Sequence, residues 1–61
     1  MSREYRIIAK NRDGKEVSIA TSDRLRALFH AEIFQAKSVY NEVRIIYRDQ
    51  EYGPLNWSVM P

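Results

Sequence analysis

The stretch Arg-Ile-Ile-Ala-Lys at residues 6–10 and its near repeat Arg-Ile-Ile-Tyr-Arg at residues 44–48 decide the fold of this chain. Each stretch alternates apolar and polar side chains, which is typical of a strand with one buried face. Each also leads through a turn to a second alternating stretch, at residues 17–19 and residues 57–59. A hairpin is therefore expected on either side of the only long helical stretch.

The pairing within the first hairpin follows from the requirement that apolar residues share one face of the sheet. A two-residue turn at Asp13 and Gly14 would scatter the large apolar side chains over both faces. A three-residue loop at residues 12–14 pairs Ile7 with Ile19 instead. It also places Gly14 where a type I turn followed by a bulge needs a left-handed residue. We therefore expect the three-residue loop.

The helix is expected to begin at Thr21 or Ser22, either of which can cap it, with Asp23 in its first turn. The helix is expected to end at Asn41, since Asn tolerates the left-handed conformation at a helix end. The apolar residues of this segment fall on one stripe at helical spacing, and we expect that stripe to cover the sheet. The stripe consists of Leu25, Leu28, Phe29, Ile33, Ala36, Val39 and Tyr40.

The second hairpin is expected to have strands at residues 42–48 and 54–60 with a loop at residues 49–53. Pro54 has no amide hydrogen to give to a ladder, so the fourth strand belongs at an edge of the sheet. A right-handed helical crossover between the second and third strands leaves room for the first strand between them. The sequence thus predicts one α+β domain over residues 1–61, a two-layer ββαββ arrangement. One helix packs on a four-stranded antiparallel sheet of order 2-1-3-4.

Alternation along the strands predicts which side chains lie on each face of the sheet. The face beneath the helix is expected to carry Tyr5, Ile7, Ala9, Val17, Ile19, Val43, Ile45, Tyr47, Leu55, Trp57 and Val59. The opposite, open face is expected to place four basic side chains around two isoleucines. These candidate partner-binding residues are Arg6, Ile8, Lys10, Arg44, Ile46 and Arg48. Glu16 is the acidic neighbour that we expect on that face.

Three interpretations of the open face remain open. The basic side chains can simply keep an exposed sheet soluble and discourage edge pairing. They can form a flat platform for nucleic-acid phosphates or for an acidic protein surface. Alternatively, the face packs sheet to sheet against a second copy of the chain and buries the two isoleucines.

A second candidate for partner binding is Phe34, which is expected to project from the helix opposite the apolar stripe. An exposed aromatic side chain beside small residues and His30 is a reasonable anchor for a protein partner. The alternative is that Phe34 turns to the edge of the helix and covers a loop.

Residues for catalysis or metal binding are scarce. Glu32 is expected near the middle of the apolar stripe, where it would reach a Tyr hydroxyl or a basic side chain. A catalytic role for it would need a second carboxylate or a nucleophile, and none is placed to assist it. The chain has no cysteine and one histidine, His30, which we interpret as a helix-surface residue. Asp49 and Glu51 offer too few ligands for a metal ion. We therefore expect neither an enzyme nor a cofactor.

Composition gives little further direction. Ten basic and eight acidic side chains leave a net charge of +2, without a polybasic run. No apolar run approaches the length of a membrane span and the first residues lack a signal-peptide core, so a cytoplasmic protein is expected, with no membrane partner. The size is typical of small accessory or regulatory proteins of bacteria and phages.

The functional hypothesis that follows is a small non-catalytic interaction module. It acts through its open sheet face on a protein partner or on a second copy of itself, and no small-molecule substrate is expected. The alternative is a nucleic-acid-binding protein that places the basic residues of the same face on phosphates.

Overall fold

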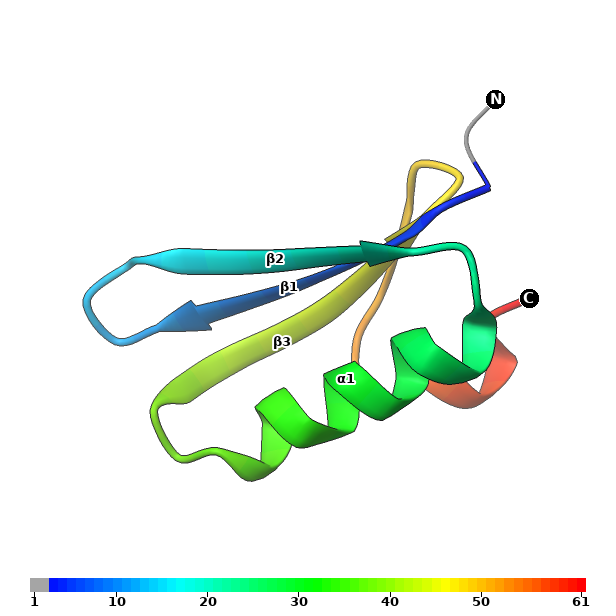
Figure 1. Ribbon diagram of the computed structural model, residues 1–61. Helices are drawn as coiled ribbons and strands as arrows, with labels where there is room; N and C mark the ends of the chain where they lie inside the picture. The colour runs from blue at the N-terminus through cyan, green and yellow to red at the C-terminus, as the bar shows by residue number, and fades with distance from the viewer. Residues whose placement is uncertain (1–2) are drawn as a thin grey trace.

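The computed structural model describes residues 3–61 and has two layers (Figure 1). One layer is a four-stranded antiparallel sheet with the strand order β2-β1-β3-β4, and the other is a single helix, α1, packed on one of its faces. The predicted fold class and strand order are both confirmed. None of the helices in the described residues is long and apolar enough to cross a membrane.

The first hairpin joins β1 (Tyr5–Asn11) to β2 (Glu16–Thr21). Ile7 lies opposite Ile19, so the predicted three-residue loop and its register are confirmed. Gly14 in that loop has a φ of 85°, a conformation that glycine adopts without the steric cost of a Cβ atom. The side-chain oxygen of Asn11 accepts hydrogen bonds from two backbone amides of the loop and fixes its shape.

The two similar strands lie side by side in the middle of the sheet. The third strand, β3 (Tyr40–Tyr47), pairs with β1, and Ile7 lies opposite Ile45. Both isoleucine side chains are completely buried. The repeated Arg-Ile-Ile motif therefore supplies the centre of the core.

The fourth strand differs from the prediction. A two-residue turn at Arg48 and Asp49, with φ angles of 51° and 65°, leads directly into the short strand β4 (Gln50–Tyr52). Residues 53–61, here called the tail, leave the sheet and contain the 3₁₀ helix η1 (Trp57–Val59). The predicted strand at residues 54–60 is wrong, because Gln50 and Tyr47 already pair across the tight turn.

The helix α1 (Arg24–Ala36) begins later and ends earlier than predicted. Its N-cap is Asp23, whose carboxylate accepts a hydrogen bond from the amide of Leu25 at 3.0 Å. Thr21 ends β2 and accepts a hydrogen bond from the amide of Asp23. Lys37 closes the C-terminal end, so Tyr40 belongs to β3.

The face of α1 that meets the sheet also differs from the prediction. Its completely buried residues are Ala27 and Ala31, while Leu28 and Phe34 are partly buried on either side of them. Of the predicted stripe, Leu25, Phe29 and Ile33 are turned away from the sheet, while Leu28 and Tyr40 still pack against the core. The buried core consists of Tyr5, Ile7, Ala9, Ala27, Ala31, Val43, Ile45, Tyr47, Trp57 and Met60. Three residues predicted for the core, Val17, Leu55 and Val59, are exposed.

Candidate functional site

The outward surface of α1 carries large apolar side chains. Leu25 is 71% exposed and Phe29 is 60% exposed, and Ile33 one turn further along is also exposed. The three residues are spaced four apart, so they lie on one face of the helix. Because Ala27 and Ala31 take the place against the sheet, these larger residues are left facing solvent.

A shallow groove of about 550 Å³ lies beside this surface, between α1 and the tail. We call it the helix–tail groove. Its helix side is lined by Leu25, Leu28, Phe29 and Glu32, and its tail side by Pro54, Trp57 and Ser58. Leu55 and Val59, which belong to the same tail, are 94% and 72% exposed. An apolar concavity of this kind is typical of a site that binds another molecule.

Among residues 3–61, Glu32 is the only charged residue that lines the helix–tail groove. Its side chain is exposed and forms no ion pair or hydrogen bond with any residue in the range 3–61. The expectation that it is buried and held by a tyrosine hydroxyl or a basic side chain is therefore wrong. The cause is the orientation of α1, which turns Glu32 outward together with Phe29.

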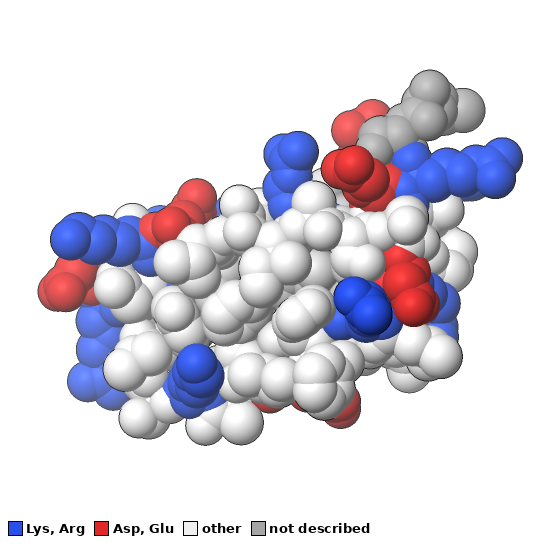
Figure 2. Space-filling model, in the orientation of Figure 1, with Lys and Arg blue, Asp and Glu red and all other residues white. Residues whose placement is uncertain are grey.

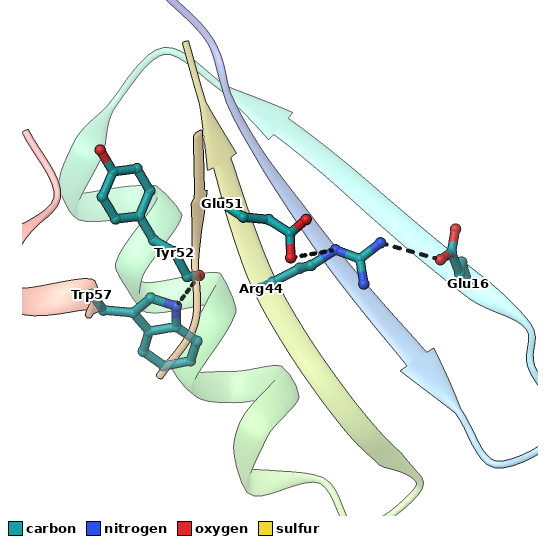
Figure 3. A network of polar contacts seen from close by, with 5 residues as sticks. All are labelled: Glu16, Arg44, Glu51, Tyr52 and Trp57. Carbon is teal, nitrogen blue, oxygen red and sulfur yellow. Dashed lines mark hydrogen bonds and ion pairs between the residues drawn. The ribbon is translucent and has the colours of Figure 1, made fainter. Parts of the chain in front are cut away.

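The tail wall of the groove is fixed by three hydrogen bonds to the rest of the fold. The indole Nε1 of Trp57 donates to the carbonyl oxygen of Tyr52 at 3.0 Å (Figure 3). The Nε of Arg24 donates to the carbonyl oxygen of Met60 at 2.9 Å, and the Tyr5 hydroxyl donates to that of Pro61 at 2.6 Å. Together with the burial of Trp57, these bonds hold the tail against α1 and β1. The groove is therefore preformed.

Phe34 does not project into solvent as expected. It is partly buried against the core, and its ring meets that of Tyr40 edge to face with 5.3 Å between the ring centroids. The expectation that Phe34 is exposed is wrong, since Phe34 lies near the sheet side of α1 and Phe29 takes the outward position. Its role in partner binding stays a prediction.

The open face of the sheet holds more acidic side chains than the sequence suggested. Lys10 lies opposite Glu16 on β2 and opposite Glu42 on β3. Arg44 reaches across the sheet to Glu16 at 3.5 Å and to Glu51 at 3.7 Å (Figure 3). The expectation that Glu16 is the only acid on this face is wrong, because register also brings Glu42 and Glu51 to it.

The remaining residues of the predicted sheet surface are placed as follows. Ile8 and Ile46 lie on the open face and are each half-buried, with Arg6 exposed opposite Ile46. Arg48 lies in the turn after β3, where its guanidinium sits 5.2 Å from the centroid of the Tyr47 ring. The structure thus brings Arg6, Ile8, Lys10, Arg44 and Ile46 onto one face and places Arg48 at its end.

Sequence reasoning missed the helix–tail groove. One signal was available, because Ala27 and Ala31 repeat at a spacing of four and small residues allow a helix to approach a sheet closely. No comparable signal in the sequence indicates that the tail leaves the sheet. Residues 3–61 contain no group of three or more His, Cys, Asp or Glu side chains placed to hold a metal ion.

Comparison with protein-family models, with curated proteins and with solved structures finds no match to this chain. What the chain binds must therefore follow from the chemistry of its own surfaces.

Proposed function

We propose that this protein is a small non-catalytic interaction module that binds a protein partner in the helix–tail groove. The partner contributes a segment with large apolar side chains and a Lys or Arg residue that pairs with Glu32. The observation that carries the proposal is the exposure of Leu25 and Phe29 beside a preformed apolar groove.

Burial of these side chains supplies the affinity. An aromatic side chain that becomes fully covered at the centre of an interface is a common binding hot spot, and Phe29 has the outward position needed for that role. Glu32 supplies specificity, because a carboxylate without an ion pair at the rim of an apolar groove favours a partner that carries a positive charge. A small apolar molecule would bury Phe29 as well but would leave Glu32 without a counter-charge.

The open sheet face supports partner binding less well. Its isoleucines are half-buried, and its basic residues Lys10 and Arg44 already have acidic neighbours. The same balance weakens the alternative hypothesis of nucleic-acid binding, which needs cations free to contact phosphates. We therefore place the contact surface on α1 and the tail.

A random peptide library displayed on phage, selected against the immobilised protein, tests the proposal. We expect the selected peptides to combine large apolar residues with Lys or Arg. Binding to Phe29→Ala should be at least about tenfold weaker, because truncation of a hot-spot aromatic costs about 1.4 kcal/mol or more. Binding to Glu32→Lys should be weaker as well, and that variant should select acidic peptides instead.

Val39→Ala is the matched control, since Val39 is an exposed apolar residue outside the groove and its truncation should leave binding unchanged. Peptides that bind Phe29→Ala as tightly as the wild type, yet lose affinity for Ile46→Asp, would move the contact surface to the open sheet face. A library that yields no peptide specific for the folded protein would also contradict the proposal.

A further inference from the structure

Within residues 3–61, no strand pairs with the outer edge of β2. This strand is the first in the order β2-β1-β3-β4, and its six residues pair with β1 alone. The amide of Asn11 donates to the carbonyl of Lys15 at the start of the hairpin. Because the direction of backbone groups alternates along an antiparallel strand, Glu16, Ser18 and Ala20 direct their N–H and C=O groups to the free edge.

The usual features that protect an edge strand are missing from most of β2. Residues 17–21 contain no charged residue and no proline, and the register with β1 has no bulge. The opposite edge of the sheet is better protected, since β4 has three residues and Pro54 follows it closely. A regular, uncharged edge strand is a template for pairing with another chain.

The helix leaves the β2 side of its own sheet face partly uncovered. Val17 shares a face with the buried Ala9 but is 42% exposed, because α1 packs mainly over β1 and β3. Figure 2 shows the result from the side of β2 and α1. Uncharged atoms cover the centre of this face, and most charged side chains lie toward its margins. Val17 therefore places an apolar side chain beside the free edge, with few charges around it.

We propose that two copies of this chain pair through β2 in antiparallel orientation, so that their two sheets become one continuous sheet. The occupant is a second copy because β2 is complementary to itself. Apolar side chains share a face across the new pair only when the two-fold axis passes through a residue position. With the axis at Ile19, Val17 lies opposite the partner's Thr21. In the same register, Lys15 of one copy lies near the end of the partner strand. The carboxylate of the partner's Asp23 then offers it an opposite charge. This contact does not involve the helix–tail groove, which stays free in both copies.

Sedimentation equilibrium of the full chain from micromolar to millimolar concentration tests the proposal. We expect the wild-type mass to rise from monomer to dimer. Ser18→Pro should remain monomeric, because proline removes an amide that faces the free edge and spares the ladder with β1. Ser18→Thr keeps that amide and should dimerise like the wild type. Circular dichroism and the fluorescence of Trp57 report whether each variant is folded.

Amide hydrogen exchange on the wild type gives a second test that needs no variant. The amides of Glu16, Ser18 and Ala20 should exchange more slowly as concentration rises, while those of Val17 and Ile19 are protected throughout by β1. Lys15→Glu should weaken the dimer and Lys15→Arg should preserve it. A wild-type chain that stays monomeric at millimolar concentration overturns the proposal. So does a dimer in which the exchange of Ser18 is unchanged.

Discussion

Tyr5 ties the beginning of the described chain to its end. Its hydroxyl donates to the carbonyl oxygen of Pro61 at 2.6 Å, and its ring stacks on that of Tyr47 with 4.2 Å between centroids. The side chain is buried, so the hydroxyl has exchanged water for the carbonyl oxygen of Pro61. Tyr5 thereby helps to fix the tail that forms one wall of the helix–tail groove.

Burial raises the pKa of the Tyr5 phenol above its ordinary value of about 10, and the neighbouring Tyr47 adds to the rise. The folded state therefore favours the neutral phenol. Its contribution to stability is complete below the unfolded-state pKa and is lost as pH rises through the folded-state pKa. We expect the free energy of unfolding in urea to fall above about pH 10, and to fall less steeply in Tyr5→Phe. Equal slopes for the two proteins would show that other groups control the alkaline transition.

Among the elements, the first hairpin could be predicted residue by residue and the second could not. The first hairpin has a glycine at its left-handed position and apolar residues that fit one register only. The second turns at Arg48 and Asp49, both with positive φ, and neither residue marks such a turn in the sequence. Alternation therefore predicts a strand for the tail and does not show the wall that the tail forms beside α1.

The rotation of α1 has a physical cause that apolar periodicity does not show. The sheet already fills the core with large side chains, including Tyr5, Ile7, Ile45 and Tyr47, so a close helix fits best with small residues beneath it. Ala27 and Ala31 meet that requirement and are completely buried. Periodicity finds the most apolar face of a helix, which here is the face left to solvent.

Substitution of single helix residues distinguishes the observed orientation of α1, with Ala27 and Ala31 against the sheet, from the predicted orientation, with the stripe of large apolar residues against the sheet. Ala31→Leu should lower the free energy of unfolding by about 1–3 kcal/mol, because the larger side chain has no space against the sheet. Ala36→Leu, the same change at an exposed position, is the control and should have little effect. Leu25→Ala should cost about 0.5 kcal/mol or less. If the predicted stripe faced the core, Leu25→Ala would instead cost about 2–5 kcal/mol. Urea unfolding monitored by Trp57 fluorescence measures all three.

At the scale of the whole molecule, the net charge of +2 is misleading about the open sheet face. Composition counts the charges, whereas register decides which of them are neighbours. Lys10 lies between two glutamates across the strands, and Arg44 has an ion pair on each side. Ion pairs at such partly exposed positions add little to stability, but they occupy cations that a phosphate backbone would need.

Binding to a mixed-sequence duplex oligonucleotide should therefore be weak and only mildly sensitive to salt. Four free phosphate contacts would give a log–log slope of the binding constant against salt of about −3 to −4, and we expect a slope shallower than about −2. Removing the carboxylates that pair with Arg44, in the double variant Glu16→Gln and Glu51→Gln, should strengthen binding and steepen the slope by about one. Fluorescence anisotropy titrations at several salt concentrations measure both slopes. A wild-type slope near −4 that Arg44→Gln reduces would show that the face binds phosphates despite its glutamates.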